Sequence, residues 1–244
     1  MCCFILLEQY SNKIVILVLI SYTPAKQMKD EGFSPEVSKR KPPMALNYFS
    51  EGVNGSKLFS DLIAFDIETF SPNGFPYNAE DPVVNFSIVV PLVKNGILSL
   101  SVIGEPSIED SMLFWLHELL RNFKGAYLLT YNGTKFDVKY VLQRGRMYNL
   151  NFEDVFTNLW HIDVYRMLKW LNIKLPKYNQ KFVEKCLGIR RVIHYVTGRS
   201  YHLLYREFLE NGTLTPMFYN IEDSFGCLRI ANAILRLLNR KEKR

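Results

Sequence analysis

The segment LIAFDIETF (residues 62–70) limits the fold most, because it is an apolar run that carries two acidic residues. Such a run indicates a buried strand. Side chains two residues apart on a strand point to the same face, so the carboxylates of Asp66 and Glu68 lie side by side. Burying two like charges is costly, since each carboxylate raises the pKa of the other. Something positive must therefore compensate them.

The composition is that of a packed globular protein. The 244 residues are 48% hydrophobic and 14% aromatic, which suits one large domain or a domain with an appendage. Thirty Lys and Arg residues against 24 Asp and Glu residues give a net charge of +6. This charge is compatible with a polyanionic partner, and equally with a basic soluble protein that has none.

The cysteines and the N-terminal segment bear on the cell compartment. Cys2, Cys3, Cys186 and Cys227 form no C-x-x-C pair and no spacing typical of a metal site or a disulfide framework, so we expect a reducing, cytoplasmic location. The apolar segment IVILVLISY (residues 14–22) is shorter than the about 20 residues that span a bilayer, and we expect no membrane partner. It is either a buried strand or an extension outside the working protein, and a signal peptide is a less favoured alternative.

A change in composition divides the chain. Residues 23–43 carry charge and proline and little that can be buried, which is typical of a linker or a mobile loop. We therefore place an N-terminal extension and linker at residues 1–46 and the main domain at residues 47–244. The domain contains no internal repeat.

The order of patterns along the domain predicts an α/β fold. Three β-rich stretches, residues 62–67, 83–90 and 97–103, predict an antiparallel meander. Ser107 and Asp110 resemble a capping box at the start of a helix that runs to residue 123. We then expect a strand at residues 126–130, a helix at 136–143, a short strand at 161–164 and a mostly helical remainder. These elements predict a mixed five-stranded sheet flanked by helices.

Two further acidic residues, Asp137 and Asp223, lie in segments that are predicted to be helical. Asn132 and Gly133 break the fourth strand, and Asp137 then falls in the first turn of a helix, where the helix dipole tolerates a negative charge. Tyr219 and Asp223 are four residues apart on an amphipathic helix and so share a face. Each also has a structural interpretation, because Asp137 suits any helix start and Tyr219 any half-buried aromatic.

These segments together resemble the three motifs of the DEDD, RNase H-like 3′–5′ exonucleases, and most closely the proofreading domain of family-B DNA polymerases. The first motif is Asp66-Ile67-Glu68-Thr69, the second runs from Asn132 to Asp137, and the third is Tyr219 with Asp223. The segment HIDVYRML (residues 161–168) is similar to an H-x-D-x-Y segment of those polymerases. Tyr219 stands where another branch has histidine, which indicates the tyrosine subtype. The resemblance implies an RNase H-like fold for the sheet.

The resemblance also implies what compensates the carboxylates. Asp66, Glu68 and Asp223 would hold one divalent ion, with Asp66 bridging to a second whose hydration shell Asp137 anchors. Hard oxygen ligands without His or Cys suit Mg²⁺ or Mn²⁺. Two such ions roughly 3.5–4 Å apart activate water and neutralise the leaving oxygen in phosphodiester hydrolysis. Tyr219 would position the attacking water, because a phenol with an ordinary pKa of about 10 is a poor base at neutral pH.

Substrate contacts are expected around these ions and in one basic stretch. The resemblance places the terminal nucleotide against Thr69, Phe70, Asn132 and Phe136, although both phenylalanines also suit core packing. Between residues 174 and 206, eight basic residues stand against one acidic residue, Glu184, with aromatic residues interleaved. A phosphate track and a solvated basic surface both explain this stretch, and we favour the track. Its candidate contacts are Lys177, Lys181, Arg190 and Arg191.

The expected function is therefore a standalone, metal-dependent 3′–5′ exonuclease that acts on single-stranded DNA or a frayed 3′ end. Too little of the sequence remains for the polymerase palm, fingers and thumb, which implies a separate nuclease or a subunit of a polymerase or repair assembly. RNA 3′-end trimming and a non-catalytic nucleic-acid-binding module are the alternatives, because contacts to the 2′-hydroxyl cannot be read from the sequence.

Overall fold

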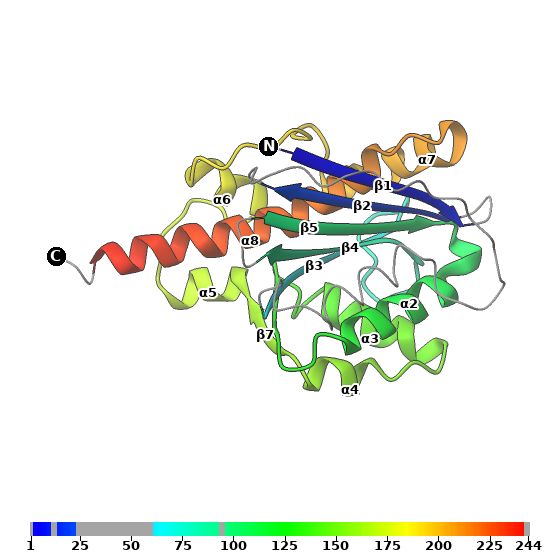
Figure 1. Cartoon of the computed structure of the whole chain (residues 1–244), viewed down its shortest axis with the longest axis horizontal. Coiled ribbons are helices and arrows are strands. Elements are labelled where there is room, and N and C mark those ends of the chain that lie inside the picture. The colour runs from blue at the N-terminus through cyan, green and yellow to red at the C-terminus, as the bar shows by residue number, and fades with distance from the viewer. Residues whose placement is uncertain (1, 11–13, 23–60, 93–95, 242–244) are drawn as a thin grey trace.

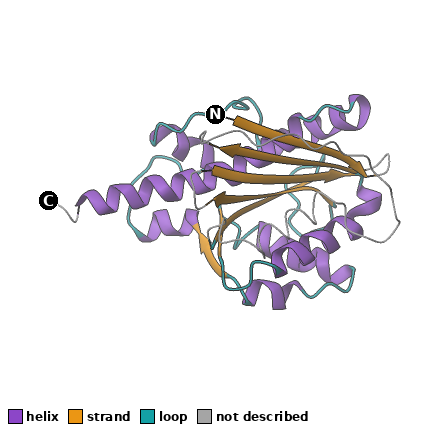
Figure 2. Cartoon of the chain, in the orientation of Figure 1, coloured by secondary structure: helices purple, strands orange, loops and turns teal. Residues whose placement is uncertain are grey.

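The computed structural model describes residues 2–10, 14–22, 61–92 and 96–241. A seven-stranded sheet lies between two layers of helices (Figure 1), and Figure 2 separates strands from helices by colour. The strands, in the order in which they lie in the sheet, are β1 (Cys2–Tyr10), β2 (Ile14–Tyr22), β5 (Gly96–Gly104), β4 (Val83–Leu92), β3 (Leu62–Thr69), β6 (Tyr127–Thr130) and β7 (Trp160–Asp163). The helices are α2 (Glu109–Arg121), α3 (Asp137–Met147), α4 (Phe152–Thr157), α5 (Val164–Trp170), α6 (Gln180–Cys186), α7 (Tyr201–Asn211) and α8 (Thr215–Lys241), with two 3₁₀ turns, η2 (Pro106–Ile108) and η3 (Gly198–Ser200).

The sheet is mixed, as expected from the sequence. Strands β3, β4 and β5 form the predicted antiparallel meander, and β6 and β7 continue the sheet in parallel with β3. The predicted number of five strands was wrong, because β1 and β2 add two more at the edge next to β5. All nine residues of β2 pair with β5, from Ile14 opposite Gly104 to Tyr22 opposite Gly96.

Residues 14–22 are thus a strand of the sheet, and Ile16 and Leu17 are fully buried. This is the buried-strand alternative of the two that their sequence left open. The expected linker at residues 23–43 and the expected boundary at residue 47 lie outside the described residues. The division into two segments therefore stays a prediction.

The alternation of side chains along β3 decides what each face of the sheet contacts. Phe65 and Ile67 belong to an apolar core that β3 shares with α2, α3 and α4. Ala64 faces the opposite way, into a second core shared with α5, α6, α7 and α8. Because side chains alternate along a strand, Asp66 and Glu68 project on the side of Ala64, where α8 crosses β3 and β4.

Helix α2 begins differently from the prediction. Ser107 lies in η2 and donates to Glu105 Oε2 at 3.3 Å, so the expected capping box with Asp110 was wrong. Glu109 opens α2 instead, and its buried carboxylate pairs with Arg144 and accepts a hydrogen bond from the backbone N of Val83. None of the described helices is long and apolar enough to cross a membrane.

Candidate metal centre

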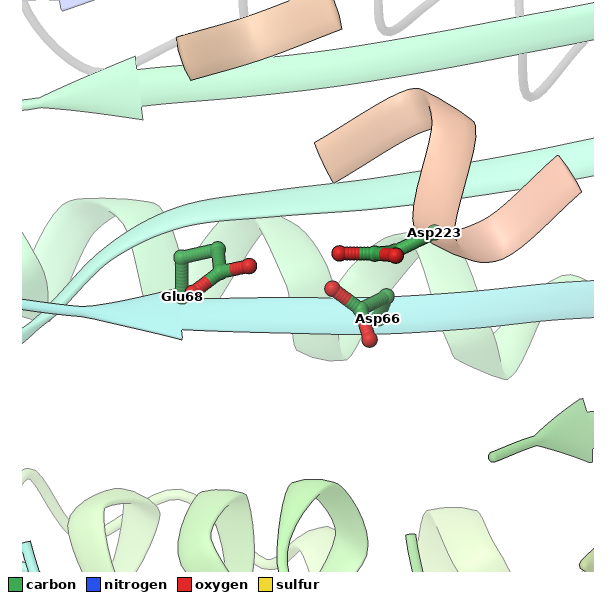
Figure 3. Close-up of side chains that lie close together, drawn as sticks. All are labelled: Asp66, Glu68 and Asp223. Carbon is green, nitrogen blue, oxygen red and sulfur yellow. The ribbon is translucent and has the colours of Figure 1, made fainter. Parts of the chain in front are cut away.

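Three carboxylates converge where β3 ends and α8 crosses it. Asp66 and Glu68 project from β3, and Asp223 reaches toward them from α8 (Figure 3). One oxygen atom from each of the three lies within 4.8 Å of the others. All three side chains are half-buried, so the cluster is reachable from solvent. The structure thus brings together residues 155 positions apart in the chain, Glu68 and Asp223.

Polar side chains of β4 hold α8 in this place. Ser87 lies directly opposite Asp66 in the sheet, and its Oγ donates to the carbonyl of Asn220 at 2.8 Å. The same hydroxyl is 2.6 Å from Ser224 Oγ. Buried polar groups need hydrogen-bond partners, so these contacts fix both the position and the rotation of α8. Asp223 is then on the face of α8 that is turned to β3.

Asp137 approaches the cluster from the second motif. Because β3 and β6 are parallel, their carboxyl ends reach the same edge of the sheet, and the loop after β6 begins α3 beside β3. Asp137 Oδ1 accepts a hydrogen bond from the backbone N of Ile67 at 3.1 Å. The loop needs glycine at residue 133, where a Cβ atom would lie 2.3 Å from the Oγ1 of Thr130.

The electrostatics are those of an acidic site that the nearby cations of the protein compensate only in part. Burial, and then the neighbouring carboxylates, raise the pKa of Asp66 and of Glu68 well above their ordinary values. Burial is also the main cause that raises the pKa of Asp137 to about 7. These shifts mean that a cation beside the carboxylates would favour their charged forms.

The donor set fits one or more hard divalent cations. Every carboxylate of the cluster offers oxygen, and no His or Cys side chain belongs to it. Asn220 Nδ2 donates to Asp66 Oδ2 at 2.7 Å, whereas Asn220 Oδ1 and Arg191 Nη1 are buried without a hydrogen-bond partner among the described residues. Such buried atoms leave bonding capacity at the site for a further ligand or its water.

Tyr219 lies one turn before Asp223 and is almost completely buried. Its ring packs against Tyr201, with centroids 5.7 Å apart, and Lys181 Nζ lies 4.6 Å from its centroid. Burial, and then Asp223, raise the pKa of Tyr219 further above its ordinary value. A phenol with a raised pKa keeps its proton at neutral pH and can donate a hydrogen bond.

The residues expected to hold the terminal nucleotide adjoin the carboxylates in the sequence, with Thr69 and Phe70 after Glu68 and Phe136 before Asp137. Thr69 is buried and its Oγ1 is 2.7 Å from Ser71 Oγ. Phe70 is half-buried against Tyr205, with ring centroids 5.2 Å apart. Phe136 is half-buried between Phe75 and Tyr140, at 5.3 and 5.1 Å. Both phenylalanines thus combine packing with a partly exposed surface, as both interpretations of their sequence allowed.

The backbone of Asn132 is in the left-handed conformation, with a φ of 63°. Asparagine tolerates this conformation better than most residues, which suits the tight turn between β6 and α3. Its backbone N donates to Asp163 Oδ1 at 2.9 Å. The amide side chain of Asn132 is half-buried beside the start of α3.

The basic stretch does not form one uniform surface. Lys177 and Arg190 are exposed, as a phosphate contact requires. Lys181 is half-buried, donates to the carbonyl of Val196, and has a pKa lowered by burial. The guanidinium of Arg191 is buried and ion-paired to Asp223 and Glu184, which differs from the exposed position expected of a phosphate contact.

The aromatic residues of the stretch divide in the same way. Tyr201 and Tyr205 belong to the core between the sheet and α7, so they are not available for stacking on bases. Tyr195 is exposed, and Tyr178 and Phe182 are half-buried. Glu222, which adjoins Asp223, accepts the backbone N–H groups of Val192 and Ile193 and so lies outside the carboxylate cluster.

Four functional candidates were missed in the sequence. Asn220 is three residues before Asp223, and this helical spacing was the available signal for it. Glu184 stood out as the one acidic residue within a basic stretch, which is typical of an ion pair. Asp163, which binds the backbone of the second motif, lies in the HIDVYRML segment, which was its signal. Gln180, whose Nε2 donates to the Asp223 carbonyl at 2.6 Å, gave no comparable signal.

Comparisons with known proteins agree with this geometry. A model of the RNase H superfamily matches residues 63–234, which include every carboxylate of the site and Tyr219. The fold is similar to that of the family B DNA polymerase from the hyperthermophilic archaeon Pyrobaculum calidifontis, with a TM-score of 0.53 and 16% sequence identity. That match covers 70% of this chain and 24% of the polymerase chain. No curated protein matches the sequence.

Proposed function

Because the chain belongs to the RNase H superfamily, we propose that it is a metal-dependent 3′–5′ exonuclease that hydrolyses single-stranded DNA. The observation that carries this proposal is the convergence of Asp66, Glu68 and Asp223 within 4.8 Å, with Asp137 next to them on the backbone of Ile67. Four carboxylates at one edge of the sheet are costly to bury, and Arg191 is ion-paired to Asp223 alone among them, so a divalent cation would compensate the others.

The carboxylates would hold the cations, and other residues would handle the substrate. Asp66, Glu68 and Asp223 would bind one Mg²⁺ or Mn²⁺ ion, and Asp66 and Asp137 a second. Bound there, the ions would supply an activated water and neutralise charge on the phosphate. Tyr219, which keeps its proton, would orient the water by a hydrogen bond. Lys181 beside the Tyr219 ring adds a positive charge that suits a phosphate oxygen.

The terminal nucleotide would lie on the rim of the site. Phe70 and Phe136 offer partly exposed rings for base stacking and Asn132 offers a half-buried amide, whereas Thr69 would act from a buried position. Stacking on these rings would require an unpaired 3′ end. Lys177 and Arg190 would hold the phosphates of the strand that leads into it.

Two alternatives make different predictions from the same fold. An RNA 3′-end trimming enzyme would use the same carboxylates and prefer RNA. A non-catalytic nucleic-acid-binding module would bind single strands and cleave neither polymer. The full set of carboxylates favours an enzyme over the module. Action on DNA, action without a polymerase on the same polypeptide, a part in replication or repair, and a cytoplasmic location all remain proposals.

The experiment compares 5′-labelled and 3′-labelled single-stranded DNA and RNA of the same sequence, with Mg²⁺, Mn²⁺ or EDTA. We expect a ladder that shortens from the 3′ end of DNA in either metal and no reaction in EDTA. Asp66→Asn and Asp223→Asn should each abolish the ladder. Asp110→Asn, which removes an exposed carboxylate of α2, is the matched control and should leave the activity unchanged.

Faster shortening of RNA than of DNA would select the trimming enzyme. Single-strand binding without cleavage under every condition would select the binding module. Full digestion by Asp66→Asn protein would show that the carboxylate cluster is not the active site.

A further inference from the structure

Arg191 places a cation of the protein itself on one of the proposed metal ligands. Its side chain is 7% exposed, and its guanidinium forms ion pairs with both Asp223 and Glu184. A single nitrogen, Nη2, donates to Asp223 and, at 3.0 Å, to Glu184 Oε1. Asp223 also belongs to the three-carboxylate cluster. The Asp223 carboxylate is therefore both the ion-pair partner of Arg191 and a proposed ligand of the divalent cation.

The other half of this arrangement is built into the packing of α6 against α8. The side chain of Glu184 is 1% exposed, and Gln180 Nε2 donates to its Oε1 at 3.2 Å. Residue 226 of α8 is glycine, and a Cβ atom there would lie 1.8 Å from the same Oε1. The Glu184 carboxylate can occupy its position only because α8 has no side chain at that point.

We propose that Arg191 is a resident counter-ion that competes with the divalent cation for Asp223, and that Glu184 weakens its hold on Asp223 by sharing the guanidinium. This inference rests on the proposed function. When a cation takes Asp223, Glu184 still compensates the buried guanidinium, so neither state leaves Arg191 without an acidic partner. Arg191 thus lowers metal affinity and Glu184 partly offsets this effect, while Arg191 keeps Asp223 paired when no cation is bound.

The charges around Arg191 determine whether each substitution raises or lowers the metal affinity. Asp66 and Glu68 face it from β3, Lys181 and Glu184 from α6, and Asp223 from α8, where the backbone carbonyl of Glu222 also accepts from Nη2. Removing the positive charge of Arg191 frees Asp223 and lowers repulsion of a cation, so metal affinity should rise. Removing the negative charge of Glu184 leaves the guanidinium to Asp223 alone, so metal affinity should fall.

The test is calorimetric titration of Mn²⁺ into the full chain without nucleic acid. Partners of a metal ligand typically change metal affinity by about tenfold or more, so we expect Arg191→Gln to bind Mn²⁺ about tenfold more tightly and Glu184→Gln about tenfold more weakly. The double variant should lie between them. Arg191→Lys, which keeps the charge, should lie closer to the wild type than Arg191→Gln does.

Arg144→Gln is the matched control, because Arg144 and Glu109 form a second buried pair on the opposite face of the sheet. It should lower the melting temperature and leave Mn²⁺ affinity unchanged. Unchanged or weaker binding by Arg191→Gln would overturn the inference, and if that variant does not fold, unchanged or tighter binding by Glu184→Gln would do so. If neither the wild type nor Arg191→Gln binds Mn²⁺, the proposed function fails as well.

Discussion

Asp163 at the end of β7 shows how a residue outside the carboxylate cluster can control its geometry. Its buried carboxylate accepts hydrogen bonds from the backbone N–H groups of Asn132, Thr134, Tyr165 and Arg166, at 2.9 to 3.3 Å. Two of these groups belong to the loop before Asp137, and two to the first turn of α5. One side chain therefore caps a helix and also shapes the second motif, which gives the HIDVY segment a structural role.

Replacing Asp163 by alanine should damage both stability and the site. The free energy of unfolding should fall by about 2 kcal/mol, since a helix cap and further hydrogen bonds of a buried carboxylate are removed together. Nuclease activity should fall as well, because the loop before Asp137 is released. Thermal melting and the cleavage assay measure the two effects.

Asn151→Ala is the control for this comparison. Asn151 caps α4 through one hydrogen bond to the backbone N of Asp154, away from the cluster. It should lower stability by about 1 kcal/mol and leave activity unchanged. Wild-type activity in a destabilised Asp163→Ala protein would mean that other contacts hold the loop.

The raised pKa of Asp137 makes a prediction about pH. Its pKa is about 7 in the folded protein and 3.8 ordinarily, so the folded state disfavours the charged form. The contribution of Asp137 to the stability of the EDTA-treated protein should therefore be lost as pH rises from about 4 to about 7. Asp137→Asn, which keeps an oxygen for the Ile67 N–H group, should raise the melting temperature at pH 8 and have little effect at pH 4. An equal gain in melting temperature at pH 4 and pH 8 would show that the gain does not come from the ionisation of Asp137.

At the scale of elements, the periodic patterns of the sequence predicted the individual strands and helices. The roles that depend on contacts between elements distant in the sequence were missed. The alternation around Asp66 and the four-residue spacing of Tyr219 and Asp223 report local geometry, so the strand and the helix were both predictable. Ser87 sits in a strand pattern like any other serine, and only the approach of α8 gives it a role. The burial of Arg191 depends in the same way on Glu184 and on the missing side chain at Gly226.

The role of residues 14–22 at the edge of the sheet was ambiguous because it too depends on contact with a distant element. The apolar pattern of residues 14–22 indicated a strand, but no local signal identified β5 as its partner. The structure adds that this strand covers a hydrogen-bonding edge of the meander. Without it, β5 would present an unpaired edge and part of the apolar core to solvent.

Deleting residues 1–43 tests this edge. The motif residues all remain, which alone would predict retained activity. Because β2 pairs with β5 along its whole length and buries Ile16 and Leu17, we instead expect a less stable protein that aggregates. Size-exclusion chromatography and thermal melting of the truncated and full chains measure this, and a monomeric, fully active truncation would show that the sheet is complete without β2.

At the scale of the whole molecule, the positive charge is spread over exposed side chains of both helical layers. Lys177 and Arg190 lie in the layer that contains α8, and Arg121 and Lys124 lie with the layer of α2. A charge has to lie along the path of the strand to bind its phosphates. Neutralising Lys177 and Arg190, and separately Arg121 and Lys124, therefore distinguishes a localised binding track from a general basic surface.

Neutralising Lys177 and Arg190 to glutamine should weaken single-strand binding. It should also flatten the dependence of log K on log salt by about 0.7 for each phosphate that the variant no longer neutralises. Cleavage at saturating substrate should change much less, because uniform binding affects KM rather than kcat. Arg121→Gln with Lys124→Gln removes the same charge elsewhere and is the control.

A salt series with a fluorescent oligonucleotide and Ca²⁺ in place of Mg²⁺ measures both variants. Equal slopes of log K against log salt for the two variants would contradict the phosphate track. The substrate would then be held mainly by the residues around the carboxylates.

The placement of Asp223 on α8 also has a consequence for biosynthesis. A ribosome makes β3, with Asp66 and Glu68, long before it makes α8, and translation proceeds at about 5–20 residues per second. A nascent chain that stops before α8 holds two of the three clustered carboxylates and lacks Tyr219. It also lacks the helix whose packing shapes the pocket of Glu184. Hydrolytic competence would therefore be acquired in one late step, after all seven strands of the sheet have been made, and translation products that stop before α8 would not hydrolyse nucleic acid.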